Sequence, residues 1–301
     1  MRKDLLRARP LVEPPRGFLS GRRTVLRRSI AQMAAWVNRG LDMLPPGRWM
    51  HRMVRRGMQW TESDFQLRRG GPGLDGMRIA FLSDVHAGSY LDEADLIRIF
   101  SDLGEQEPDL VCLGGDLINS RMEELRFFEK GLARIDPPLG VFAVPGNHDH
   151  FWGADLDTWC RRLEGMGVRL LINEGTRLLH GGDGLWIAGV DDLVEGKPDL
   201  AAALEGARDD EPMIVLSHNP DFFFEAAAVE VDLTLSGHTH GGQVRFGSWA
   251  PVNHSRFGWL EGWHEIDESS LYVGRGVGVT LLPLRFGAPA EIPMLRLQAP
   301  R

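Results

Sequence analysis

Five short apolar runs in this chain each end in a loop that carries Asp, His or Asn beside glycine or proline. These loops read SDVHAG (83–88), GGDLIN (114–119), PGNHDH (145–150), LSHNPD (216–221) and SGHTHGG (236–242). In α/β proteins, functional side chains collect outside the carboxyl ends of the strands. We therefore expect the five loops to converge on one polar site at the edge of a sheet.

Between these loops, buried-strand patterns alternate with helical patterns. Strands are predicted at 77–84, 109–116 and 140–150, the last including its loop, and amphipathic helices at 93–103 and 123–135. Further along, helices are predicted at 156–165 and 222–228, and strands at 168–173, 185–192, 213–220, 231–240, 270–277 and 292–298. This order predicts an α/β fold with two mixed sheets packed together and helices outside.

The composition is that of a globular protein with a substantial core. Of the 301 residues, 43% are hydrophobic and 25% are charged, which suits one catalytic domain with an extension. The two cysteines are too few for a disulfide framework, and Cys112 lies in the apolar run LVCLGG. A disulfide-stapled fold and a zinc-thiolate site are therefore both disfavoured.

Charge divides the chain into two parts. The formal net charge is −8, yet residues 1–58 hold fourteen Arg and Lys against three Asp and Glu, so the rest is strongly acidic. An acidic body disfavours nucleic acid as the main partner, because duplex binding needs a basic surface. We predict a basic amphipathic helical extension over 1–70 and a catalytic domain over 71–301.

The extension has the pattern of an interfacial helix. Within 30–44 apolar residues recur at helical spacing, with Ser29 as an N-cap, Pro45 and Pro46 as a stop, and arginines and tryptophans on both sides. This pattern favours a helix lying on an anionic membrane surface, and a helix packed on the protein's own body is the alternative. No stretch approaches the length of a membrane span. The segment GRRTVLR (21–27) also resembles a twin-arginine export signal.

Seven side chains in the polar loops could bind metal ions. They are carboxylates, imidazoles and one amide: Asp84, His86, Asp116, Asn147, His218, His238 and His240. A nitrogen and oxygen set suits Mn²⁺, Fe or Zn²⁺, whereas Mg²⁺ and Ca²⁺ favour oxygen alone. Seven donors are too many for a single ion that keeps a position open for water. Two divalent ions that share a carboxylate would use them all, as in two-metal phosphoryl transfer.

Five motifs of this chain resemble, in order, the five signature blocks of calcineurin-like metallophosphoesterases. They are Asp84-Val85-His86, Gly115-Asp116, Gly146-Asn147-His148-Asp149, His218 and Gly237-His238-Thr239-His240. The resemblance extends from about residue 77 to residue 297 and implies a four-layer α/β/β/α sandwich. It implies that Asp84, His86 and His240 hold one ion, that Asn147, His218 and His238 hold the other, and that Asp116 bridges them.

Two catalytic roles follow from the same resemblance. His148 would protonate the leaving oxygen or stabilise the charge of the transition state, and Asp149 would orient its ring. Many members carry a second acid three residues after the aspartate of the second block, where this chain has Asn119. Arg245 follows the histidine loop and is a candidate ligand of a substrate phosphate, with a solvated strand residue as the alternative.

The segments GHTHGGQVR, APV, GRGVG and PLRFGAPAEI are similar to a bacterial membrane-associated branch of the family that includes UDP-2,3-diacylglucosamine pyrophosphatase-like enzymes. This likeness implies hydrolysis of a phosphodiester or pyrophosphate bond, by a metal-bound hydroxide, in an amphipathic or nucleotide-sugar lipid. It implies a peripheral location on the cytoplasmic face of the inner membrane, with export as the alternative. The alternative functions are a soluble broad-specificity phosphodiesterase or nuclease and a non-catalytic scaffold of the same fold.

Overall fold

The computed structural model describes residues 57–300 apart from residues 89, 151–154, 248 and 281–283. The predicted interfacial helix and the twin-arginine segment lie outside the described residues. Across the described residues, no helix combines the length and the apolar character that crossing a bilayer requires.

The body contains two six-stranded sheets. The first has the order β1-β12-β2-β3-β4-β5, made of Gln59–Gln66, Glu291–Gln298, Arg78–Leu82, Leu110–Leu113, Val141–Ala143 and Val168–Leu170. The second has the order β10-β11-β9-β8-β7-β6, made of Gly262–Ile266, Ser269–Val273, Leu233–Ser236, Met213–Leu216, Asp183–Gly189 and Glu174–His180. Both sheets are mixed, because β12 runs antiparallel to β2, and the pairs β10–β11 and β6–β7 are antiparallel.

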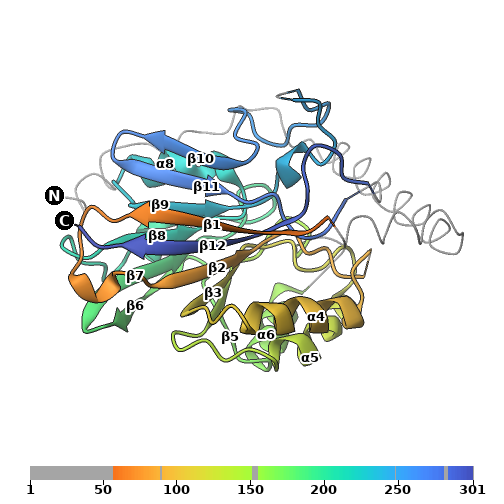
Figure 1. Cartoon of the computed structure of the whole chain (residues 1–301), viewed down its shortest axis with the longest axis horizontal. Coiled ribbons are helices and arrows are strands. Elements are labelled where there is room, and N and C mark those ends of the chain that lie inside the picture. Colours follow the sequence, from red (N-terminus) through yellow and green to blue (C-terminus); the bar gives the residue numbers. More distant parts are fainter. Residues whose placement is uncertain (1–56, 89, 151–154, 248, 281–283, 301) are drawn as a thin grey trace, which may run out of the picture.

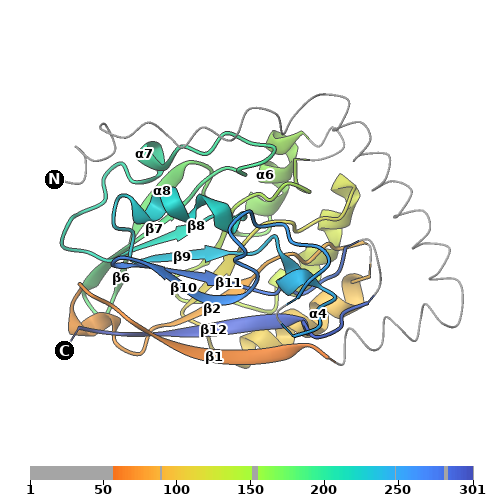
Figure 2. The ribbon, with the colours of Figure 1, turned by 90° about the horizontal axis from the view of Figure 1, so that it is seen from above.

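Helices cover the outer faces of both sheets (Figures 1 and 2). On the first sheet lie α4 (Glu93–Gly104), the 3₁₀ helix η2 (Met122–Phe128), α5 (Glu129–Leu132) and α6 (Leu156–Glu164). On the second lie α7 (Leu200–Ala203), η4 (Pro220–Phe222) and α8 (Phe223–Ala227). Two more 3₁₀ turns are η1 (Pro72–Leu74) and η5 (His240–Gly242).

Successive side chains of the central strand β2 belong to two different hydrophobic cores, one on each face of the first sheet. In β2, Ile79 and Phe81 belong to the core between the sheets, whereas Ala80 and Leu82 belong to the core under α4. Successive side chains of a strand point to opposite faces, so a strand buried on both faces must be apolar throughout. The structure confirms the predicted fold of two mixed sheets flanked by helices.

Three strands were not expected from the sequence: β1, β6 and β10. Each is an edge strand in which exposed and partly buried residues are mixed, and only Phe65 and Leu178 are buried. Such strands lack the continuous apolar run that marks a central strand. β1 lies before the boundary expected at residue 70, yet all eight of its residues pair with β12. The helix expected at 123–135 is the 3₁₀ helix η2 followed by the single turn α5.

Candidate metal centre

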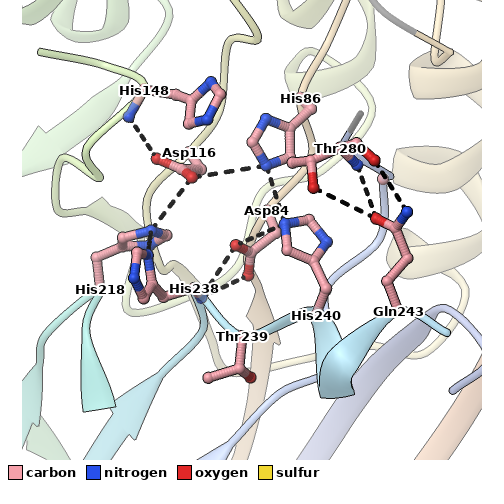
Figure 3. A network of polar contacts seen from close by, with 12 residues as sticks. Asp84, His86, Asp116, His148, His218, His238, Thr239, His240, Gln243 and Thr280 are labelled. Carbon is pink, nitrogen blue, oxygen red and sulfur yellow. Dashed lines mark hydrogen bonds and ion pairs between the residues drawn. The ribbon is translucent and has the colours of Figure 1, made fainter. Parts of the chain in front are cut away.

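All seven predicted ligands lie just beyond the carboxyl ends of central strands. Asp84 and His86 follow β2, Asp116 follows β3, Asn147 follows β4, His218 follows β8, and His238 and His240 follow β9. The two sheets therefore contribute to one site. Donor atoms of Asp84, His86 and His240 lie within 4.8 Å of one another, and so do those of Asp116, His218 and His238 (Figure 3).

Asp116 belongs to the second group and also lies beside the first. Its Oδ2 atom is 3.5 Å from Nε2 of His86 and 3.3 Å from Nε2 of His218. In the first group, Nε2 of His240 is 3.1 Å from Nε2 of His86 and 3.4 Å from Oδ1 of Asp84. One carboxylate oxygen thus faces an imidazole of each group, which is the arrangement expected of a bridging ligand.

Five of the ligand residues have a left-handed backbone. The φ angles are 52° at Asp84, 45° at His86, 53° at Asp116, 71° at His238 and 53° at His240. Residues with a Cβ atom rarely adopt this conformation, because it is strained. Such strain persists where the surrounding structure enforces it, and it concentrates at functional sites.

Glycines in the motifs let the loops approach the ligands closely. A Cβ atom on Gly237 would lie 2.3 Å from Oδ2 of Asp84, and one on Gly146 would lie 2.3 Å from Oδ1 of Asp116. Both distances are well below van der Waals contact. The motifs therefore need glycine at these positions for space.

Backbone groups orient the ligands. Nδ1 of His218 lies 2.8 Å from the carbonyl oxygen of Gly114. Because a carbonyl oxygen only accepts, Nδ1 carries a hydrogen, and Nε2 is the ring atom that faces Asp116. The backbone N–H of His238 donates to both carboxylate oxygens of Asp84 at 3.0 Å, which joins β9 of the second sheet to β2 of the first.

The buried setting controls protonation. Burial lowers the pKa values of His86, His238 and His240 well below the usual histidine range, and burial raises the pKa of Asp84 to about 6. Burial also opposes ionisation of Asp116, but the neighbouring His218 holds the pKa of that carboxyl well below its usual range. A divalent ion binds neutral imidazoles and ionised carboxylates. Despite burial, Asp116 raises the pKa of His218 well above the usual histidine range, so an ion bound there would displace a proton.

The residues present fit such ions. Oδ1 of Asn147 is buried and has no hydrogen-bond partner within the described part of the chain. A buried amide oxygen without a partner costs free energy, and coordination to a cation would satisfy it. The donor set of imidazole, carboxylate and amide oxygen matches Mn²⁺, Fe or Zn²⁺.

His148 lies beside the ligands. Its backbone N–H donates to Oδ1 of Asp116 at 2.7 Å, and its ring packs edge-on against the ring of His86 with centroids 4.5 Å apart. Nδ1 of the ring lies 2.7 Å from the carbonyl oxygen of Asn119. The oxygen that orients this ring is therefore a backbone carbonyl, at the position where many family members carry an acid.

The contacts of Asp149 differ from its predicted role of orienting the His148 ring. Its fully buried carboxylate accepts hydrogen bonds from the backbone N–H groups of Leu117, Ile118 and Gly146, and from Nε1 of Trp159. Both carboxylate oxygens are used in these bonds. Asp149 therefore joins the loop after β3 to the loop after β4, and so acts on the site through the backbone.

Glu124 was not expected at the site. Oε2 of this buried side chain accepts from the backbone N–H groups of Asn119, Ser120 and Arg121 at 2.9, 2.8 and 3.0 Å. It thus fixes the peptide whose carbonyl faces His148. The sequence held no signal for this role, because Glu124 looks like an ordinary residue of an amphipathic helix.

Arg245 is held by the protein itself. Its guanidinium pairs with Glu261 at 2.6 Å and donates to the carbonyl of Gly287 at 3.1 Å. Sequence reasoning also missed Arg285, which is partly buried and donates to the carbonyls of His240 and Gly278. Burial lowers the pKa of Arg285 to about 10. Arg285 therefore fastens the histidine loop to the loop after β11.

Comparison with known proteins gives the family. The family model for calcineurin-like phosphoesterases matches residues 77–242. The chain belongs to this family. It is 33% identical to the uncharacterized metallophosphoesterase YkuE of Bacillus subtilis, over 75% of this chain and 81% of that protein. It is 32% identical to a transmembrane protein with metallophosphoesterase domain from Bos taurus, over 79% of this chain and only 57% of that protein.

Among solved structures, a dimetal phosphatase from Danio rerio is similar over 74% of this chain and 99% of that one, with 13% identity and a TM-score of 0.44. Family membership and the donor groups together establish a metal-dependent phosphoester hydrolase. The predicted family and reaction class are thus confirmed.

Proposed function

We propose that this phosphoesterase is dinuclear. One ion is held by Asp84, His86 and His240, the other by Asn147, His218 and His238, and Asp116 is shared. The observation that carries this proposal is that Oδ2 of Asp116 lies 3.5 Å from Nε2 of His86 in one donor group and 3.3 Å from Nε2 of His218 in the other. Mn²⁺ is the first candidate because oxygen donors accompany the imidazoles, and Fe and Zn²⁺ are the others.

When bound, two such ions supply a water of lowered pKa and neutralise charge on the phosphoryl oxygens. The chain itself contributes His148. Because the Asn119 carbonyl can only accept, Nδ1 of His148 carries a hydrogen, and Nε2 is the ring atom that can exchange a proton. His148 would donate that proton to the leaving oxygen, or donate a hydrogen bond to the phosphoryl group as charge develops.

The substrate that we propose is a phosphodiester or pyrophosphate with an apolar part, met at a membrane surface on the cytoplasmic side. The basic segment 1–58 supports this, and so does the similarity to a Bos taurus protein described as a transmembrane protein. UDP-2,3-diacylglucosamine has the required chemistry and is one candidate, although neither named relative carries a substrate in its name.

The experiment is hydrolysis of bis(p-nitrophenyl) phosphate by the full chain, stripped with EDTA and reloaded with Mn²⁺, Zn²⁺ or Fe²⁺. His148→Ala should lower kcat by about 10²- to 10⁴-fold while metal content stays at the wild-type level. His180→Ala is the matched control, because His180 pairs with the amino end of β7, away from the strand ends that carry the site. Equal kcat in wild type and His148→Ala would refute the assignment.

A further inference from the structure

Exposed apolar side chains gather on two loops that follow the metal centre. Nine large hydrophobic side chains are exposed among the described residues, and six of them lie in segments 243–260 and 284–288. These six are Phe246, Trp249, Val252, Phe257, Leu284 and Phe286. Isolated exposed apolar residues are ordinary, but a cluster of this kind marks an interaction surface.

Three of these rings form one patch, which we call the aromatic rim: Phe246, Trp249 and Phe286. The ring centroids of Phe246 and Trp249 are 6.2 Å apart, and those of Phe246 and Phe286 are 5.0 Å apart. Their exposed fractions are 59%, 62% and 53%. These rings pack on one another while more than half of each stays exposed.

The rim borders the metal centre. Phe246 lies six residues after His240, and the intervening Val244 pairs with Phe286 in an isolated bridge. From the same loop, the exposed ring of His254 lies 5.5 Å from the ring of His238. A surface that covered the rim would therefore lie next to the metal centre.

Charge is distributed differently around the rim than over the rest of the body. Segments 243–260 and 273–290 contain four arginines and no Asp or Glu. From residue 59 to the end, the chain as a whole carries thirty-nine acidic and twenty basic residues. These two segments therefore add no negative charge, although Glu261 and Glu291 pair with Arg245 and Arg275 beside them. A face that is less acidic than the rest of the body is better suited to an anionic surface.

The basic segment joins the body at this same face. Arg245, next to Phe246, pairs with Glu261. Arg275 lies 3.7 Å from Glu261 and donates to Oε1 of Gln59 at 3.2 Å, and Gln59 is the first residue of β1. Gln59, which directly follows the basic segment 1–58 with its fourteen Arg and Lys, therefore lies within a few side chains of the rim.

We propose that the aromatic rim docks on an anionic phospholipid bilayer, with the metal centre facing the lipid head groups. Aromatic side chains are favoured at the boundary of head groups and acyl chains, and the Arg and Lys of the neighbouring basic segment are attracted by anionic lipid. Docking is a binding property in its own right. Only its consequence, preference for substrate held in a membrane, rests on the proposed function.

The test is co-sedimentation of the full chain with vesicles of 30% phosphatidylglycerol in phosphatidylcholine, at 0.1 M and 0.5 M NaCl. At 0.5 M NaCl the charge component is screened, so wild type should still bind, and F246A/W249A/F286A should bind at least about tenfold more weakly. Leu179→Ala is the control, since Leu179 is 57% exposed on the edge strand β6. Equal partitioning of wild type and the triple variant, or complete release of wild type by salt, would overturn the proposal.

A second readout separates this proposal from the proposed function. The triple variant should keep the wild-type kcat on soluble bis(p-nitrophenyl) phosphate, because the rim residues hold no part of the metal centre. Failure of all proteins to hydrolyse the soluble diester would count against the proposed function and leave the vesicle result standing. Hydrolysis with unchanged vesicle binding in the triple variant would count against the rim alone.

Discussion

Replacing Glu124 tests how the catalytic ring is held, because Glu124 reaches His148 only through the peptide of Asn119. Oε2 of Glu124 accepts three backbone N–H groups of residues 119–121, and the Asn119 carbonyl oxygen lies 2.7 Å from Nδ1 of His148. Glu124 is thus a positioning residue. We expect Glu124→Ala to free this peptide and so to impair the ring.

The magnitude follows from the contacts. A hydrogen bond to a charged acceptor contributes about 1.5–3 kcal/mol, and Glu124→Ala removes three. Two effects offset this loss: burial raises the pKa of Glu124, which shows that its charge is disfavoured there, and the amides of the partly exposed Ser120 and exposed Arg121 can bond to water. We expect a net loss of about 2 kcal/mol in the free energy of unfolding. Misplacement of the ring should lower kcat about 10- to 100-fold.

The assay is a double-mutant cycle on bis(p-nitrophenyl) phosphate, with urea unfolding measured alongside. Glu124→Gln is the matched control, since its amide oxygen can still accept the three N–H groups and its shape is unchanged. In the His148→Ala background, Glu124→Ala should have no further effect on kcat. An equal loss of kcat in both backgrounds would refute the reasoning, because Glu124 would then act on the reaction by another route.

Three further changes test the centre and its surroundings. Asp116→Asn should reduce bound metal from about two ions per chain to one or fewer by mass spectrometry, and retention of two would contradict a bridging role. Gly237→Ala should lower metal content with little effect on secondary structure, because its Cβ would displace the Asp84 carboxylate 2.3 Å away. The hydrogen bond between His150 and Asp191 raises the pKa of His150 despite burial. This pair therefore stabilises the fold fully below about pH 6.5, and less as the pH rises through the pKa of His150 in the folded protein. In urea unfolding with EDTA, His150→Gln should therefore cost about 1 kcal/mol more at pH 6 than at pH 9, and a pH-independent cost would contradict this.

The central strands and the donors could be predicted from local sequence. β2, β3 and β8 are almost wholly buried and consist largely of apolar runs that end in polar loops. β9 is also buried, although Thr and Ser alternate with Leu in it. Three of the four edge strands, β1, β6 and β10, could not be predicted in this way, because one side of each meets solvent. The ion pair of Arg245 could not be predicted for the same reason. Its partner Glu261 lies sixteen residues further along the chain, directly before the unpredicted edge strand β10.

The contacts that position the site depend on tertiary structure. A motif can show that His148 is present, but which backbone carbonyl meets its ring depends on how the loop after β3 folds. Asp149 illustrates the point, since its neighbour in sequence is His148 while its hydrogen bonds reach the loop thirty-two residues earlier and Trp159. Sequence spacing could not distinguish these partners.

The left-handed ligand residues bear on whether the ions are needed to form the site. Strain of about 1–3 kcal/mol at each of five residues is comparable to the whole stability of a typical domain, so the fold itself must offset it. Backbone bonds between the loops do this: the N–H of Asp84 donates to Gly115, the N–H of His86 donates to Asp116, and the N–H of Gly278 donates to Asp84, at 2.9, 3.0 and 2.8 Å. None of these bonds involves a metal ligand atom. The loops of Asp84, His86 and Asp116 are thus joined by bonds that do not use the ligand atoms, and we expect these loops to keep their shape when the ions are removed.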